Sequence, residues 1–117
     1  MTAPWSPHAM SRTSPRCTPV PEEVRELADL LERRWQLSII YAALTGALRF
    51  HEFADAVAGI SPRMLSERLH DLETAGIVIR TVVPSSPPSV EYRLTEHGRK
   101  LAPIIEAMRS YVDEPAG

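Results

Sequence analysis

The sequence predicts one mainly helical α+β domain that carries a single two-stranded sheet. Apolar residues repeat with a period near 3.6 over most of residues 22–75, which is typical of helices packed on a core. The period then changes to about 2 in two short segments, 77–83 and 90–94, that flank a proline-rich connection. The length of 117 residues suits one domain.

The composition is that of an ordinary globular protein, with 44% apolar residues, 24% charged residues and a formal net charge of −2. No apolar run approaches the ~18 residues that a membrane helix needs, and the N-terminus has no apolar signal segment. We therefore expect a cytoplasmic protein that does not associate with a membrane. The overall charge gives no indication of nucleic-acid binding, so such a function must come from local geometry.

Residues 1–21 differ from the rest of the chain. They contain Arg12 and Arg16, no acidic residue, and five of the eleven prolines. Because proline removes backbone donors and little periodic apolar surface is present, we expect a disordered Pro/Ser/Thr-rich arm. A domain over 22–112 and a flexible tail over 113–117 follow.

Two helices are predicted next, over 22–34 and 35–44. Glutamates in the first turn of the first helix lie where the helix dipole favours negative charge. This helix is expected to bury one stripe, made of Val24, Leu27, Ala28 and Leu31. The second helix is apolar nearly all round, which places it in the middle of the core. Gly46 ends it, and residues 47–49 are expected to form a short stub of strand.

A short amphipathic helix from Phe50, closed by Gly59, precedes a longer helix over 61–75. Ser61 is a good N-cap and Pro62 suits the first helical position. Gly76 is expected to be the left-handed residue of a Schellman ending. The inward face of this helix takes Leu65, Leu69 and Leu72.

After the hairpin, a last helix is predicted over 95–112 with Thr95 as its N-cap. Pro103 lies well inside it and is expected to kink it near Arg99. The side chains that we expect this helix to bury are Leu101, Ile104, Ile105, Met108, Tyr111 and Val112.

This order of elements is a winged helix-turn-helix. A short helix, a turn containing glycine and a capped second helix form the helix-turn-helix unit, and the hairpin after it is the wing. The first and last helices flank this unit and carry apolar stripes. We therefore expect them to be dimerisation helices.

The residues also resemble HxlR-type winged helix-turn-helix regulators over about residues 24–112. The resemblance is carried, in one unbroken order, by RW at 34–35, GALRFHEF at 46–53, GISPRMLSERL at 59–69, LETAGI at 72–77, PPSVEYRLTEHG at 87–98 and LAPI at 101–104. Members of this family are prokaryotic dimeric transcription regulators. The resemblance therefore implies two partners, double-stranded DNA and a second copy of the chain.

This chain departs from the family pattern where its relatives carry basic residues. It has Ala54, Asp55 and Ser89 at such places, and its basic and acidic residues balance over 47–100. Because phosphate neutralisation supplies most non-specific affinity for DNA, we expect a weaker or more selective binder than its relatives, unless Arg12 and Arg16 of the arm compensate.

The helix over 61–75 is the predicted recognition helix, because such helices reach base edges from their N-terminal residues. Arg63 is the best candidate for a bidentate contact to guanine, and Ser61 lies where the helix N-terminus can hold a phosphate. The alternative is an ordinary solvated amphipathic helix. The candidate DNA-binding residues are Ser61, Arg63, Met64, Ser66, Glu67, Arg68, His70, Arg80 and Arg93.

Cys17 is a candidate redox-sensing residue, because some relatives carry a sensing cysteine before the first helix and the adjacent Arg16 would favour the thiolate. The alternative is a cysteine without function. The four histidines lack the spacing of metal ligands, and no nucleophile elbow or phosphate loop occurs. We expect no metal, no cofactor and no enzyme activity.

The main hypothesis is a sequence-specific DNA-binding transcriptional regulator, expected to repress, that acts as a homodimer on a pseudo-palindromic operator. One alternative is a winged-helix module for protein interaction. Another is a redox-responsive or small-molecule sensor with weak DNA binding, whose unknown effector would lie among Trp35, Tyr41 and Phe53.

Overall fold

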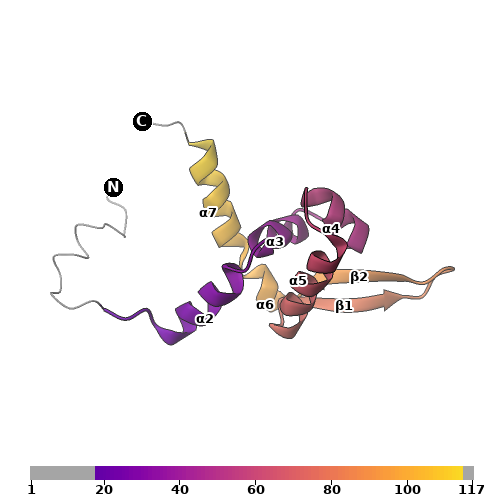
Figure 1. The fold of residues 1–117 in the computed structure, drawn as a ribbon, viewed down its shortest axis with the longest axis horizontal. Coiled ribbons are helices and arrows are strands. Elements are labelled where there is room, and N and C mark those ends of the chain that lie inside the picture. Colours follow the sequence, from indigo (N-terminus) through magenta and orange to yellow (C-terminus); the bar gives the residue numbers. More distant parts are fainter. Residues whose placement is uncertain (1–17, 115–117) are drawn as a thin grey trace.

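The computed structural model describes residues 18–114, and over this range the chain has the predicted winged helix-turn-helix fold (Figure 1). The elements in chain order are α2 (Glu22–Leu31), α3 (Gln36–Leu44), α4 (Phe50–Ala56), α5 (Pro62–Thr74), β1 (Val78–Val83), β2 (Ser89–Leu94), α6 (Glu96–Arg99) and α7 (Ala102–Asp113). Helices α3, α4 and α5 gather at the base of the hairpin, whereas α2 and α7 diverge from them (Figure 1). Cys17 and the two arginines of the arm lie outside the described residues.

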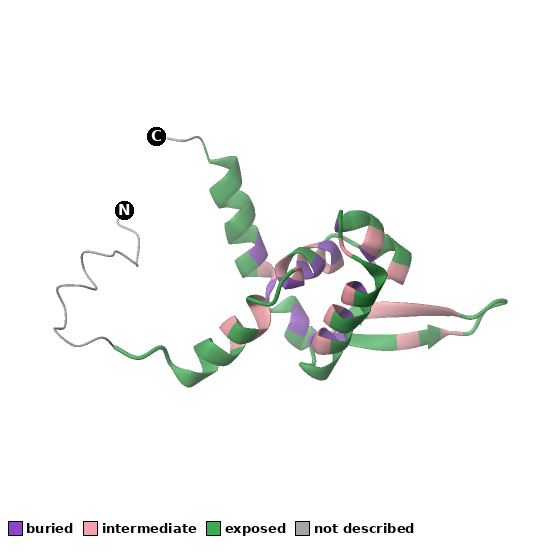
Figure 2. Cartoon of the chain, viewed as in Figure 1, coloured by how far each residue is buried: buried purple, intermediate pink, exposed green. Residues whose placement is uncertain are grey.

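The core lies where α3 meets α4 and α5. Ile39 and Ile40 of α3 and Phe53 of α4 have no exposed surface, and the three leucines predicted for α5 are buried as well. Burying each such side chain stabilises the fold by roughly 1.5–3 kcal/mol. Figure 2 shows the buried residues at these helices and at the foot of α7, while α2 is partly exposed and partly intermediate and most of α7 is exposed. The monomer is therefore held together around α3.

Helix α5 begins as the sequence predicts. The Ser61 Oγ accepts a hydrogen bond from the backbone N–H of Met64 at 3.1 Å, and Pro62 is the first helical residue. Proline costs nothing there, because the first backbone N–H groups of a helix have no partner within it.

The C-terminal end of α5 is the predicted Schellman motif. The N–H of Ile77 donates to the carbonyl of Leu72 at 2.9 Å, and the N–H of Gly76 donates to the carbonyl of Glu73 at 3.0 Å. Gly76 has a φ of 76°, which glycine adopts without steric cost. The orientation of α5 is thus fixed at both ends by local interactions.

The register of the wing decides which side chains share a face. Strands β1 and β2 are antiparallel, with Arg80 opposite Tyr92 and Ile79 opposite Arg93. Because neighbouring side chains on a strand point to opposite faces, Arg80 and Arg93 lie on opposite faces of the wing. Tyr92 packs edge-to-face on Phe53 with ring centroids 6.3 Å apart, so its face of the wing is turned toward the helical core.

The first helix differs from its prediction in length and burial. It ends at Leu31 and not at residue 34, and a turn leads to Trp35, which has a φ of 77°. Val24 is 54% exposed and the rest of the predicted stripe is at most half-buried, so no residue of α2 is fully buried. The expectation of a fully buried stripe is wrong for the monomer, because Leu27 and Leu31 pack against the core with only part of their surface and Val24 is exposed.

Residues 47–49 do not form the predicted stub of strand. The carbonyl of Leu48 accepts one bond from the N–H of Tyr92 at 2.7 Å. The N–H groups of Leu48 and Arg49, however, both donate to the Glu52 Oε1 at 2.8 Å. Glu52 thereby occupies the donors that a third strand would need, and the segment serves as the start of α4.

The last helix is broken and not kinked. Helix α6 ends at Arg99, a turn follows, and α7 restarts at Ala102 with Pro103 in its first turn. The break occurs because proline lacks the N–H that would bond to Arg99 and its ring clashes with that carbonyl. Leu101 and Ile105 are buried as expected. The four other residues predicted to be buried are exposed, namely Ile104, Met108, Tyr111 and Val112.

Helix α6 is packed closely against the end of α5. The Thr95 Oγ1 accepts a bond from the N–H of Gly98 at 2.9 Å, as its predicted N-cap role requires, and donates to the carbonyl of Gly76. A Cβ at Gly98 would clash with the carbonyl oxygen of Ile77. Glycine is therefore needed at this position for the approach of the two backbones.

Candidate nucleic-acid interface

The exposed face of α5 carries most of the predicted DNA-binding residues. Arg63 has 91% of its side chain exposed, and its Nε lies 3.4 Å from the Glu67 Oε2 one turn along. Ser66 and His70 are exposed on the same helix, and Ser61 is exposed at its start. These five residues form one polar surface, which we call the reading face.

Two predicted residues of α5 lie apart from the reading face. Arg68 has only 16% of its side chain exposed, and its guanidinium lies 3.3 Å from the Asp71 Oδ2. Met64 is half-buried. The Arg68 Nη2 also lies 3.8 Å from the Glu67 Oε1, so its guanidinium is held between two carboxylates of α5, an environment that the helical spacing did not reveal.

The two arginines of the wing also differ from each other. The Nε and Nη2 of Arg93 donate to the Glu91 Oε1 at 3.0 and 2.6 Å, so its charge is compensated. Arg80 is exposed and forms no ion pair within residues 18–114. Since they lie on opposite faces, the structure does not place both against one DNA backbone.

Arg49 is a candidate contact that the sequence reasoning did not single out. It is exposed directly before α4, and no ion pair among the described residues engages it. The signal was its place one residue before a helix, with glutamate three residues later, as in a capping arrangement. Hydrogen bonds from the N–H groups of Arg49 and Leu48 lower the pKa of Glu52, so this carboxylate stays ionised.

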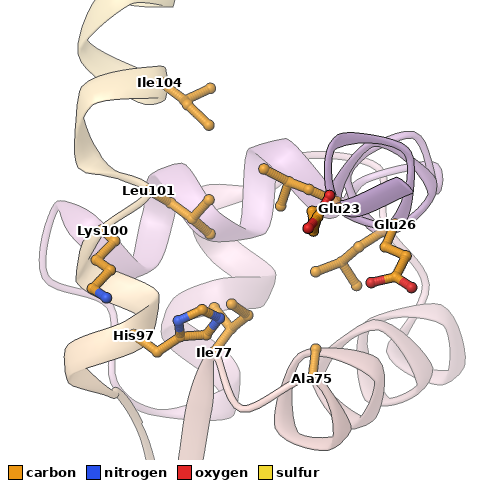
Figure 3. A pocket seen from close by; sticks show the side chains of 10 residues that line it. Glu23, Glu26, Ala75, Ile77, His97, Lys100, Leu101 and Ile104 are labelled. Carbon is orange, nitrogen blue, oxygen red and sulfur yellow. The ribbon is translucent and has the colours of Figure 1, made fainter. Parts of the chain in front are cut away.

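A groove lies on the other side of the domain, between α2 and the α6–α7 corner. It encloses about 530 Å³. Figure 3 shows Glu23 and Glu26 on the α2 wall, and His97 and Lys100 on the α6 wall. The apolar side chains that line it are Leu27, Leu30, Ala75, Ile77, Leu101 and Ile104.

A second, almost wholly apolar hollow of about 580 Å³ continues along α7. It is lined by Pro103, Ile104, Ala107, Met108, Tyr111 and Val112. Ile104 belongs to both hollows, so the groove and this face of α7 form one continuous surface.

The three aromatic residues expected to surround an effector lie in different environments. Phe53 is fully buried against Tyr92, whereas Trp35 lies under the guanidinium of Arg34. The Tyr41 hydroxyl accepts a bond from Arg109 at 2.6 Å in a shallow hollow beside α7. The expectation of one cavity lined by all three is therefore wrong.

The described residues also define what this part of the chain lacks. Within residues 18–114, no three His, Cys, Asp or Glu side chains come together as a metal site would require. None of the helices in the same range has the length and apolar character needed to cross a membrane.

Comparison with known proteins gives consistent matches. A model of the HxlR-like helix-turn-helix family matches residues 30–116. The uncharacterized HTH-type transcriptional regulator YvaP of Bacillus subtilis (strain 168) is 42% identical over 86 residues, which cover 74% of this chain and 80% of YvaP. The reduced form of the transcriptional regulator YodB from B. subtilis superposes with a TM-score of 0.73 at 35% identity, covering 85% of this chain and 100% of YodB. The redox regulator HypR in its oxidized form gives a TM-score of 0.73 at 37% identity, with 81% and 98% covered.

Proposed function

Because the chain belongs to the HxlR-like helix-turn-helix family, it is a DNA-binding transcriptional regulator, and we propose that it represses transcription as a homodimer. Its operator is pseudo-palindromic, and it acts in the cytoplasm, where the DNA is. The observation that carries this proposal is the reading face, a polar surface on a helix whose opposite side is buried.

The reading face fits the major groove. Recognition helices contact bases from their N-terminal turns, and Arg63 lies in the first turn of α5. Its guanidinium can leave the exposed pair with Glu67 and donate both N–H groups to guanine O6 and N7. Ser66, Glu67 and His70 supply further donors and acceptors along the groove.

We expect phosphate contacts on both sides of the base contacts that the reading face makes. The exposed N-terminus of α5 at Ser61 offers backbone donors to a phosphate. On the wing we assign the phosphate contact to Arg80, because Arg93 is already paired with Glu91. Arg80→Ala should therefore flatten the salt dependence of binding by about one unit for each phosphate that is no longer neutralised, whereas Arg93→Ala should leave it nearly unchanged.

The groove and the apolar face of α7 are the proposed contact with a second copy. Exposed side chains such as Met108 and Tyr111 continue from the groove without a break. In a two-fold dimer the same surface meets itself, so an acidic wall can meet the basic wall of the other copy. In this groove Glu23 lies on the acidic wall and Lys100 on the basic wall, so the two walls are complementary in charge.

The decisive experiment is selection of binding sites from random DNA duplexes. We expect an enriched pseudo-palindrome whose half-sites are separated by about one helical turn, ~34 Å. The same protein should bind that site in a gel shift and lose it when one half-site is scrambled. A selection that enriches no sequence would contradict the proposal and favour a protein-interaction module.

A redox-responsive regulator is the second candidate function. The similar protein HypR is named a redox regulator, which supports Cys17 as the candidate sensing residue of this chain. Diamide should weaken binding to the selected site in the wild type but not in Cys17→Ser. An unchanged wild-type affinity after diamide would remove Cys17 from the proposal.

A further inference from the structure

The loop between α2 and α3 contacts both parts of the helix-turn-helix. The Nη1 of Arg33 lies 3.0 Å from the Asp71 Oδ2 on α5. The Trp35 ring lies over Gly59 in the turn before α5. Its Cη2 would be 3.5 Å from a Cβ added to this glycine, which is van der Waals contact. One short segment therefore contacts the recognition helix and the turn that leads into it.

The backbone of this loop is held in an unusual conformation. Trp35 has a φ of 77°, although it is not glycine. Such a conformation costs free energy and persists where the surrounding contacts determine it. The Arg34 guanidinium stacks 4.7 Å from the ring centroid of Trp35, and the carbonyl of Trp35 accepts the N–H of Ile39 at the start of α3.

Asp71 joins this loop to the inner side of α5. Its Oδ2 is shared by Arg33 at 3.0 Å and Arg68 at 3.3 Å, and only 22% of the Asp71 side chain is exposed. The largely buried Arg68 is thereby held on the helix itself, while Arg33 reaches the same oxygen from outside the helix. The carboxylate is the point where α5 and the loop meet.

Besides this loop, the half-buried side chains of Leu27, Leu30 and Leu31 orient α2 by packing against the core. The helix has no fully buried residue, and the groove of about 530 Å³ separates part of it from the α6–α7 corner. The angle between α2 and α5 is therefore set by two features, the half-buried leucines of α2 and the loop with its contacts to Asp71 and Gly59.

We propose that Arg33, Asp71 and Trp35 are positioning residues that set the half-site spacing read by the dimer. This inference rests on the proposed homodimer, in which α2 belongs to the subunit contact. With the two copies joined there, the angle between α2 and α5 determines the separation of the two recognition helices. That separation must match the helical repeat of the DNA. The residues thus affect specificity without touching a base.

The test compares Arg33→Gln, Asp71→Asn and the double variant on the selected operator. Affinity is also measured on operators with one base pair added or removed between the half-sites. We expect each single variant to lose about threefold to tenfold in affinity on the natural spacing, the range expected for a partly exposed pair present twice per dimer. The loss on the altered spacings should be smaller, and the double variant should be no worse than either single one.

Two controls separate positioning from other roles. Arg25→Gln removes the same charge from an exposed position of α2 and should keep the wild-type spacing preference. Arg33→Lys keeps the charge and should retain part of the wild-type spacing preference. Thermal melting and light scattering should show that all variants fold and dimerise like the wild type.

Other results would overturn the inference. If Arg33 contacted phosphate directly, Arg33→Gln would weaken all spacings alike and lower the salt dependence, while Asp71→Asn would not reproduce the effect. An unchanged spacing preference in both variants would also contradict it. A monomeric wild type or a selection without an enriched site would instead overturn the proposed homodimer function, and this inference with it.

Discussion

Arg63 is held by little besides one exposed ion pair. Its side chain is 91% exposed and lies 3.4 Å from Glu67, so few interactions must be broken before it can reach a base. Surface pairs of this kind contribute about 0–1 kcal/mol. A bidentate contact to guanine contributes ~1–3 kcal/mol of discrimination, which exceeds what the pair with Glu67 can offer.

Replacing Arg63 by alanine should therefore lower affinity for the selected operator by roughly tenfold to a hundredfold per half-site. Binding to unrelated DNA at low salt should change little, because that binding comes from phosphate contacts. Fluorescence anisotropy on both DNAs measures the difference, with Arg25→Ala as the matched control on α2. Wild-type affinity of Arg63→Ala for the operator would remove it from the reading face.

The sequence predicts the exposed reading face but not the role of every arginine on α5. The sequence analysis named Arg63 and Arg68 alike as candidate DNA-binding residues, because helical spacing left the environment of Arg68 open. That environment depends on Arg33, which is distant in sequence and meets the same oxygen of Asp71 in the folded chain. Likewise, the alternation of side chains in the strands did not reveal that Glu91 compensates Arg93.

At the scale of elements, prediction succeeded where the signals are local. The predicted ends of α5 are confirmed, because Ser61, Pro62 and Gly76 act on their own neighbouring backbone. The prediction of a strand stub at 47–49 is wrong, because Glu52 accepts the hydrogen bonds of the N–H groups there. The last helix was expected to continue through Pro103, but the loss of one hydrogen bond and the close packing of α6 on Ile77 break it.

Alanine substitutions at two glycines, Gly76 and Gly98, should lower the free energy of unfolding by different amounts. Nothing lies within 4 Å of a Cβ at Gly76, so Gly76→Ala should cost only the left-handed backbone penalty, roughly 1–2 kcal/mol. A Cβ at Gly98 would meet the carbonyl of Ile77, so we expect Gly98→Ala to cost about 3 kcal/mol, at the upper end for overpacking. Urea denaturation with equal m-values would measure both. A smaller loss for Gly98→Ala than for Gly76→Ala would contradict the close approach of α6.

The start of α4 should make stability depend on pH in the acidic range. Hydrogen bonds from the N–H groups of Arg49 and Leu48 lower the pKa of Glu52 in the folded chain. The stabilisation is therefore present above the pKa of the unfolded chain and is lost as pH falls through the lowered pKa. Glu52→Gln should melt below the wild type at neutral pH, and the difference should shrink toward zero in acid. A difference that stays constant with pH would show that the charge of Glu52 contributes nothing.

At the scale of the whole molecule, the exposed apolar side chains are concentrated on the terminal helices. Among the described residues, Val20 and Val24 precede or begin α2, and Ile104, Met108, Tyr111 and Val112 lie on α7, while the wing exposes Ile79 and Val82. The helices that form the core expose no comparable row. Because contiguous apolar surface on a protein of this size marks an interaction site, this distribution supports a subunit contact on the terminal helices.

Met108→Glu should convert a dimer into a monomer near 13.0 kDa, because it places a charge in the apolar face of α7. Ser110→Glu adds the same charge to α7 outside the residues that line this face, and it should remain dimeric. Light scattering at tens of micromolar distinguishes the two masses. A monomeric wild type, or a dimeric Met108→Glu, would place the subunit contact elsewhere.

The register of the wing has a consequence for how this chain can change in length. Because the two faces of β1 alternate residue by residue, a single-residue deletion between Val78 and Arg80 would transfer every later side chain of the strand to the other face. Arg80 would then leave the side that it shares with Tyr92 and join that of Arg93. Insertions and deletions inside β1 are therefore tolerated only in pairs. We expect single-residue changes in length only in the connection over residues 84–88, where side chains do not alternate between the two faces of a sheet.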